Sequence, residues 1–173
     1  MVVIILLFAT IHFVVATEPF YWRLYNGTIP NDAVSSEVSN LFVSRVGRCV
    51  DRNSVTFYPA TLDSITKSAT ANIMGKKRII TDINNIMILC TSEPERLRWE
   101  YVNIQAVKGD LLKKLVPAGY LDNIERYVGK VFHENSWKIT TLYQHGHKWE
   151  GLNIWKDNGD TTSVYDFQIL IWS

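Results

Sequence analysis

Short runs of β-branched and aromatic residues, separated by Gly, Asn, Asp and Pro, follow one another from Phe20 to the end of the chain. Within several runs apolar and polar residues partly alternate, which is the period of a half-buried strand. The sequence gives little evidence for helices. Only residues 110–115 could form a helical turn, and Pro117 prevents a longer helix. Regularly spaced short strands predict an all-β fold. The expected strands span 41–46, 54–58, 78–81, 86–90, 99–102, 127–132, 137–142, 152–155 and 165–172.

The strand pattern occurs twice in the same order. Residues 29–34 align with 116–121, 41–46 with 126–131, 71–73 with 152–154, and 86–90 with 167–171. Each copy alone leaves apolar surface uncovered, which pairing the copies face to face would bury. We therefore expect two tandem pseudo-symmetric repeats, residues 20–90 and 97–172, packed as one compact antiparallel sandwich-like domain. The charged segment 91–98, which contains Pro94, is the expected hinge.

The first sixteen residues, 1–16, contain no charged side chain and are dominated by Val, Ile, Leu and Phe. Small or modest side chains at 14–16 precede a cleavage point before Thr17, so the segment predicts a signal peptide. A membrane anchor and a buried strand are the alternatives, but a spanning helix needs about 20 apolar residues. We expect a secreted, extracellular protein with no membrane span in its mature form.

Composition and charge select no partner by themselves. The chain has 18 Lys and Arg against 17 Asp and Glu, and this net charge of +1 predicts neither nucleic-acid binding nor an anionic membrane or acidic substrate. Six Trp and eight Tyr in 173 residues exceed what a minimal core needs, and they suit strands or binding surfaces.

Two cysteines and one sequon bear on the secreted state. In an oxidising compartment Cys49 and Cys90 would close into one disulfide, and the alternative is two buried free thiols. Asn26, in Asn-Gly-Thr, is the expected glycosylation site.

These motifs resemble the DM-nine repeat family of mostly invertebrate proteins. The similarity rests on an apolar-Pro-X-X-Ala-Val turn at 29–34, an aromatic-Val-small-Arg strand at 42–45 and a closing Ile-Leu-Cys strand at 88–90, in two copies over residues 21–172. The resemblance implies an all-β pseudo-symmetric fold of intertwined antiparallel sheets, often a homodimer. It also implies that some relatives are mannose-binding lectins of pathogen recognition, and that others serve host response or salivary secretion.

Sugar-binding members of that family share an acidic residue shortly before the aromatic-Val-small-Arg strand and the Lys of a later Pro-Gly-Lys turn. Neither copy here has that turn. A sugar site needs carboxylates or amides for the hydroxyls and an aromatic ring for the apolar face. The candidate ligand-binding residues lie beside equivalent strands and could line two related pockets; the alternative is solvated strand residues with Arg45 and Lys130 holding carboxylates. The candidates are Glu37 and Arg45 in the first copy and Asp122, Glu125 and Lys130 in the second.

Catalytic and metal-binding patterns are weak. No nucleophile elbow, zinc-protease helix, phosphate-binding glycine loop or Cys-His signature occurs, so we predict no enzyme and no catalytic residue. His145 and His147 could chelate zinc with help from His133 and Glu134, but no spacing specifies a third ligand. A polar turn is the preferred explanation, and we expect no metal and no cofactor.

The sequence thus favours a secreted, non-catalytic recognition protein with lectin-like carbohydrate binding, in innate immunity or host response. The alternative is a secreted salivary or venom module that docks a secreted or cell-surface protein through its Trp-rich surface. A cleft lined by polar groups would favour sugar, and a flat exposed aromatic patch would favour a protein partner.

Overall fold

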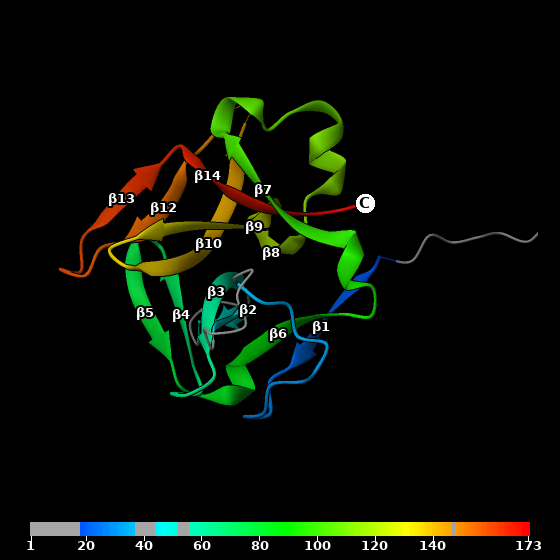
Figure 1. Ribbon diagram of the computed structural model, residues 1–173. Coiled ribbons are helices and arrows are strands. Elements are labelled where there is room, and N and C mark those ends of the chain that lie inside the picture. Colours follow the sequence, from blue (N-terminus) through cyan, green and yellow to red (C-terminus); the bar gives the residue numbers. More distant parts are fainter. Residues whose placement is uncertain (1–17, 37–43, 52–55, 147) are drawn as a thin grey trace, which may run out of the picture.

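The computed structural model consists almost entirely of antiparallel strands joined by short turns and 3-10 helices (Figure 1). It describes residues 18–36, 44–51, 56–146 and 148–173. The all-β fold class predicted from the sequence is confirmed. Residues 1–16, Glu37 and His147 lie outside the described residues. Within them, no helix is long and apolar enough to cross a membrane. The 3-10 helices are η1 (Ile83–Asn85), η2 (Pro94–Arg96), η3 (Ile104–Ala106) and η4 (Gly109–Lys114).

The first half of the chain forms one six-stranded sheet, drawn in blue to green in Figure 1. The strand order is β1-β6-β2-β3-β4-β5, so the first strand of this half, β1, lies at one edge beside the last strand, β6. These strands are β1 (Phe20–Leu24), β2 (Ser44–Val50), β3 (Phe57–Asp63), β4 (Ser68–Ile73), β5 (Lys76–Ile80) and β6 (Ile86–Thr91).

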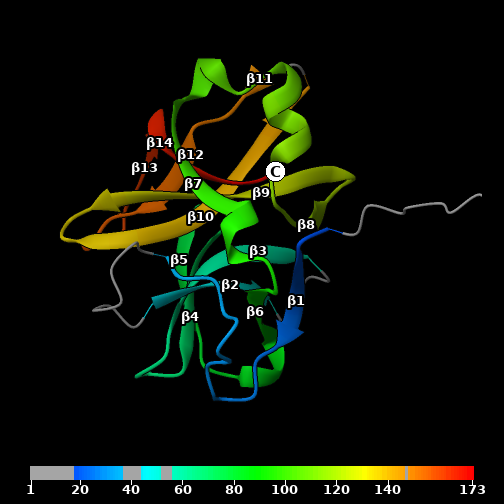
Figure 2. The same ribbon diagram turned by 45° about the vertical axis from the view of Figure 1, so that its right-hand side comes forward.

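The second half repeats that order in β7-β14-β9-β10, stacked above the first sheet in Figure 2. The second half differs from the first in its other strands. β8 pairs with β9, β11 pairs with β10, and the β12–β13 hairpin is a separate two-stranded sheet. The strands are β7 (Leu97–Asn103), β8 (Pro117–Leu121), β9 (Ile124–His133), β10 (Ser136–His145), β11 (Lys148–Trp149), β12 (Leu152–Trp155), β13 (Thr161–Val164) and β14 (Asp166–Trp172).

Strand β4 lacked a clear signal in the sequence. It reads Ser-Ala-Thr-Ala-Asn-Ile, and small residues such as alanine are depleted in strands. The strand forms because it pairs with β3 on one side and β5 on the other, which buries Ala69 and Ala71 completely. Tertiary burial therefore overrides the weak local propensity.

The register of the central strands shows how the two halves correspond. Gly47 on β2 lies opposite Ile88 on β6, and Gly129 on β9 lies opposite Ile169 on β14. The equivalent positions therefore differ by 82 residues at this point (129 − 47). Both glycines sit where a Cβ would crowd a leucine: a Cβ on Gly47 would lie 3.1 Å from Leu62 on the neighbouring strand, and one on Gly129 would lie 2.7 Å from Leu152 on β12.

This register corrects two of the alignments made from the sequence. Arg48, and not Arg45, is the counterpart of Lys130, because Val-Gly-Arg at 46–48 coincides with Val-Gly-Lys at 128–130. Val34 corresponds to Val116: Val34 N donates to Leu89 O at 2.9 Å, and Val116 N donates to Leu170 O at 3.1 Å. The alignment of 29–34 with 116–121 was wrong, since a Pro in each copy attracted the match.

Three groups of buried apolar side chains stabilise the fold. One lies within each half, and the third lies between them and draws on both. Burying each Val or Leu of the shared group contributes about 1.5–3 kcal/mol, so neither half is complete without the other. The shared group comprises Phe20, Val46, Leu89, Val116, Ala118, Val128, Ile139 and Leu170.

Two tryptophans tie the halves together reciprocally. Trp22 on β1 pairs with Leu89, and Trp99 on β7 pairs with Leu170, so the two indoles are equivalent. The Trp22 Nε1 donates to Pro117 O at 3.1 Å, and the Trp99 Nε1 donates to Ser35 O at 3.2 Å. Each half thus donates an indole hydrogen bond to the other.

The two cysteines are buried free thiols, which is the second of the two alternatives left by the sequence. Cys49 on β2 lies opposite Ile86 on β6, while Cys90 lies four residues farther along β6. Four strand residues span about 13 Å, whereas a disulfide requires a Cα–Cα separation of about 4.4–6.8 Å. The sheet register therefore prevents the disulfide.

Candidate functional site

The two halves meet along a seam between β3 and β10. The Ile139 backbone N donates to the Thr61 Oγ1 at 2.9 Å across this seam. Beside it, the Asn72 Nδ2 of β4 donates to the Asn153 backbone O at 2.9 Å and to its Oδ1 at 3.1 Å. These asparagines belong to the segments 71–73 and 152–154, which the sequence aligns. The seam therefore joins matching positions of the two copies.

A cavity of about 230 Å³ opens on this seam, and both halves line it. Its volume is suited to one monosaccharide-sized ligand. We call it the interface cavity and define it by the side chains that carry its chemistry, which are Tyr58 and Asn72 from the first half and Arg126, Thr141, Tyr143 and Asn153 from the second.

Arg126 is the charged group of the interface cavity. It is 9% exposed, and its Cζ lies 5.0 Å from the Tyr58 ring centroid and 5.3 Å from the Tyr143 ring centroid. Its Nε is buried and has no hydrogen-bond partner, and no ion pair joins its guanidinium to any residue that the structure describes. Burial lowers the pKa of Arg126, while the charge of Asp122 opposes that effect weakly. A guanidinium carries five N–H donors, so its hydrogen-bonding capacity here is largely unused.

Thr141 places a second unused polar atom at the same cavity. Its Oγ1 is buried without a hydrogen-bond partner, although Thr141 occupies the position of Thr61, whose Oγ1 is bonded. The difference has a chemical cause. The Thr61 Oγ1 accepts a hydrogen bond from the Ile139 N–H. The residue equivalent to Ile139 in the first half is Pro59, which has no N–H to donate to the Thr141 Oγ1.

Lys130, a candidate from the sequence, lies elsewhere, in the interior. It is 1% exposed, and its Nζ lies 4.2 Å from the Trp99 ring centroid and 4.4 Å from that of Trp137. The ammonium also donates to the Ser36 backbone O. These contacts place Lys130 between the two halves and not on a ligand-accessible surface.

The other candidates do not converge with Lys130. Glu125 and Lys130 are five residues apart on β9 and so point to opposite faces of the strand. The Glu125 carboxylate accepts hydrogen bonds from the Tyr120 Oη at 2.9 Å and the Tyr127 Oη at 2.5 Å. Asp122 is exposed in the turn between β8 and β9. Arg45 is partly buried on β2 and donates to the Ser44 O at 3.1 Å.

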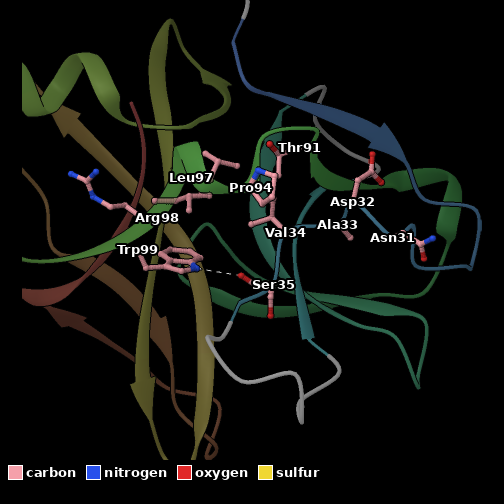
Figure 3. A pocket seen from close by; sticks show the side chains of 11 residues that line it. Asn31, Asp32, Ala33, Val34, Ser35, Thr91, Pro94, Leu97, Arg98 and Trp99 are labelled. Carbon is pink, nitrogen blue, oxygen red and sulfur yellow. Dashed lines mark hydrogen bonds between the residues drawn. The ribbon is translucent and has the colours of Figure 1, made fainter.

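A second cleft, of about 330 Å³, lies between residues 31–35 and the segment from Pro94 to Trp99 (Figure 3). Its charged side chains, Asp32 and Arg98, are already partnered within the protein. Asp32 accepts from the Tyr21 Oη, which lowers the pKa of the Asp32 carboxyl. Arg98 forms an ion pair with Glu100 at 3.2 Å. This cleft therefore presents less unused hydrogen-bonding capacity than the interface cavity.

A larger hollow of about 570 Å³ lies beside η3, β10 and β11. Trp149, Tyr165 and Leu112 line it, and the exposed Lys108 and Lys148 contribute the charge. None of the buried polar atoms that lack a partner in the described residues belongs to this lining.

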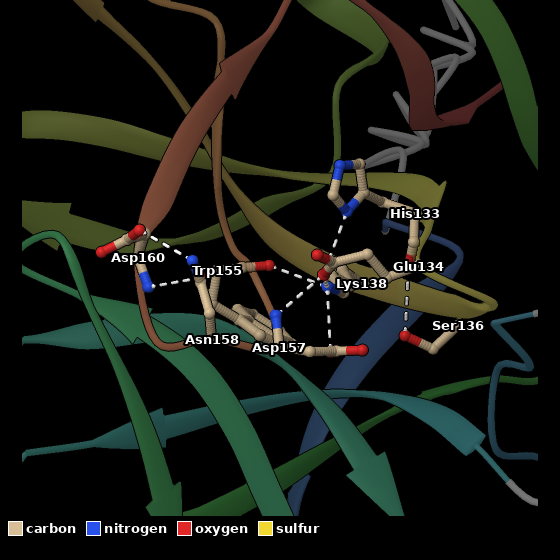
Figure 4. Close-up of polar contacts among 8 residues, drawn as sticks. All are labelled: His133, Glu134, Ser136, Lys138, Trp155, Asp157, Asn158 and Asp160. Carbon is tan, nitrogen blue, oxygen red and sulfur yellow. Dashed lines mark hydrogen bonds and ion pairs between the residues drawn. The ribbon is translucent and has the colours of Figure 1, made fainter.

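Buried Lys138 forms an ion-pair cluster beside the β9–β10 turn (Figure 4). Its Nζ lies 2.6 Å from the Glu134 Oε2, 2.8 Å from the Trp155 O and 3.6 Å from the Asp157 Oδ1. The hydrogen bond from Lys138 lowers the pKa of Glu134. Every contact in this cluster is internal, so its role is to hold the end of β12 to the hairpin.

The histidines considered for zinc are dispersed. His133 Nδ1 lies 3.3 Å from the Glu134 Oε2, and His145 is exposed at the end of β10. In the described ranges, no group of three or more His, Cys, Asp or Glu side chains could hold a metal ion.

Sequence reasoning missed Arg126 because the alignment of 41–46 with 126–131 matched it to Leu41 and pointed to Arg45 and Lys130 as the basic candidates. A usable signal existed, since Arg126, Val128 and Lys130 share one face of β9 and Val128 is completely buried. Compared with known proteins, the chain matches no family model and no curated protein.

Proposed function

We propose that this chain is a secreted, non-catalytic recognition protein that binds carbohydrate in the interface cavity. The observation that carries the proposal is the set of groups that meet there. The Asn72 and Asn153 amides lie side by side, and the rings of Tyr58 and Tyr143 line the same cavity. Amides bridge neighbouring hydroxyls and aromatic rings pack on the apolar face of a sugar, so the cavity offers both kinds of contact.

Several of these polar atoms are free to serve a ligand. Asn72 donates both of its hydrogen bonds to Asn153, and its own Oδ1 accepts none from the described residues. The Thr141 Oγ1 likewise has no partner in the described part of the chain. Sugar hydroxyls both donate and accept, so one ring could satisfy these atoms together.

Secretion is part of the proposal. It is supported by the uncharged apolar segment 1–16 and by the exposed Asn26 in a glycosylation sequon. The resemblance to the DM-nine repeat family supports it further, since that family includes secreted lectins.

The test uses the mature chain from Thr17, produced through a secretory pathway. A glycan array selects ligands, and titration calorimetry measures their affinity. We expect at least one monosaccharide class to bind, and Tyr143→Ala to weaken that binding at least tenfold. Tyr165→Ala is the matched control, because Tyr165 is 56% exposed and does not line the interface cavity. A folded protein that binds no glycan would contradict the proposal and favour a protein-docking module.

A further inference from the structure

We propose that the ligand of the interface cavity carries a carboxylate that binds Arg126, so that the protein selects acidic sugars of the hexuronic acid type. The sugar part of this inference rests on the proposed carbohydrate binding. The anion contact rests on Arg126 itself.

The first argument is the contrast between Arg126 and the other buried cations. Lys138 contacts a carboxylate, and Lys130 and Arg48 each donate to a backbone carbonyl of the opposite half. Among the described residues Arg126 has only the faces of two tyrosines as partners. Ring faces stabilise a positive charge but leave the N–H donors unused, and an unsatisfied buried charge is costly.

The second argument is that the fold does not require an arginine at this position. The counterpart of Arg126 in the first half is Ser44 (126 − 82), whose Oγ lies 2.5 Å from the Ser36 Oγ. The same strand position is therefore satisfied by a small hydroxyl in the other copy. A buried arginine without a structural partner is better explained by a ligand than by the architecture.

The third argument is the charge of the cavity. No Asp or Glu is among the described residues that line it. The charge of Asp122 acts on the pKa of Arg126, but Asp122 does not line the cavity. An anion that enters would meet one unopposed positive charge in a partly dry site, where charge-assisted hydrogen bonds are strong.

The shape of the site favours a carboxylate on a sugar ring. A carboxylate is planar and can accept two parallel N–H bonds from one guanidinium. The remaining polar atoms, on Asn72, Asn153 and Thr141, suit ring hydroxyls. A volume of about 230 Å³ accommodates one six-membered sugar ring, so a hexuronate fits the cavity.

The experiment compares matched ligands on the mature protein. Calorimetry measures glucuronate and galacturonate against methyl glucoside and methyl galactoside, with acetate and sulfate as free anions. We expect hexuronates to bind at least tenfold more tightly than the neutral sugars, and the Nε–H signal of Arg126 in NMR spectra to shift on binding. Raising the salt concentration should weaken hexuronate binding selectively.

Two variants identify the group responsible. Arg126→Gln should remove the tenfold preference for hexuronates over neutral sugars. Arg126→Lys should keep part of the preference, because the charge stays but the two-pronged geometry is lost. Thermal unfolding serves as the folding control. We expect Arg126→Gln to melt no lower than the wild type, since it removes an unpaired buried charge, and a clear loss of stability would mark Arg126 as structural and overturn the inference.

The outcomes separate this inference from the proposed function. If neutral sugars bind as tightly as hexuronates, carbohydrate recognition stands and the acidic specificity is wrong. If acetate or sulfate shifts the Arg126 signal while no sugar binds, the anion contact stands and the lectin function is wrong. If neither sugars nor anions bind, both are overturned.

Discussion

Arg48 on β2 and Lys130 on β9 occupy equivalent positions, and each places its charge against a backbone carbonyl of the opposite half. The Arg48 Nη1 donates to the Ala118 O at 3.1 Å, and the Lys130 Nζ donates to the Ser36 O. Each cation also lies over two aromatic rings of its own half. The rings are Trp22 and Phe57 around Arg48, and Trp99 and Trp137 around Lys130.

This repeated contact predicts a large effect of Lys130→Met on stability. The substitution keeps the length of the side chain but leaves the Ser36 carbonyl without this donor and removes both cation–ring contacts. We expect the free energy of unfolding in urea to fall by about 2 kcal/mol. The control is Lys77→Met on the exposed face of β5, which should change it by less than about 0.5 kcal/mol. Equal effects of the two substitutions would contradict the structural role of Lys130.

Thr61 and Thr141 are equivalent residues with opposite expected responses to valine. Thr61→Val deprives the Ile139 N–H of its acceptor, so we expect a loss of about 1 kcal/mol or more. Thr141→Val removes a buried hydroxyl that has no partner among the described residues, so stability should stay the same or rise. Chemical denaturation measures both. If Thr141 serves the ligand, its valine variant should nevertheless bind sugar more weakly.

The fold class was predictable because strand signals are local. Residues 86–90 and 167–171 illustrate this. Their apolar pattern predicts strands, and the structure pairs them with β2 and β9, the strands that contain Gly47 and Gly129. The correspondence between the two copies was harder to predict. Arg45 and Arg48 each follow a valine and a small residue, so either could match Lys130 in the sequence. Only the hydrogen bonds between strands decide which one matches Lys130.

The candidate site was less accessible to sequence reasoning. Charged residues near strands were identified, yet Glu125 and Lys130 point to opposite faces, and Lys130 is buried. Arg126 stands out only through its lack of a partner, and this property depends on residues from both halves. Tyr58 and Tyr143 are 85 residues apart in the chain, so no local pattern places them around one guanidinium.

Both thiols should be unreactive while the protein is folded. Burial raises the pKa of Cys49 and of Cys90 to about 12, so almost no thiolate forms at pH 8. We expect an aromatic disulfide reagent to label neither cysteine in the native protein, and to label both after denaturation without a reductant. A protein that yields no thiol even when denatured would contain the disulfide that the sheet register argues against.

The Lys138 cluster predicts a defined dependence of stability on pH. The pKa of Glu134 is lowered in the folded state, chiefly by the hydrogen bond from Lys138. A carboxyl whose folded pKa is depressed stabilises the protein above its unfolded pKa, near 4.3, and this contribution is lost as the pH falls through the folded pKa. Glu134→Gln should therefore lower the Tm at pH 7, and the difference from wild type should shrink below about pH 4. Asp110→Asn, in the exposed pair with Lys113, should show little difference at either pH.

Asn26 offers a direct test of secretion. It is exposed in the turn after β1, where its Oδ1 accepts the Thr28 N–H at 3.1 Å, so the amide lies on the surface. A protein that enters a eukaryotic secretory pathway should lose its first sixteen residues and acquire an N-glycan at Asn26. Intact mass before and after glycosidase treatment measures both changes. Thr28→Ala should abolish the glycan and Thr28→Ser should retain it, because the sequon accepts either hydroxyl residue. An unglycosylated chain that keeps residues 1–16 inside the cell would rule out the signal peptide, and with it an extracellular role for the interface cavity.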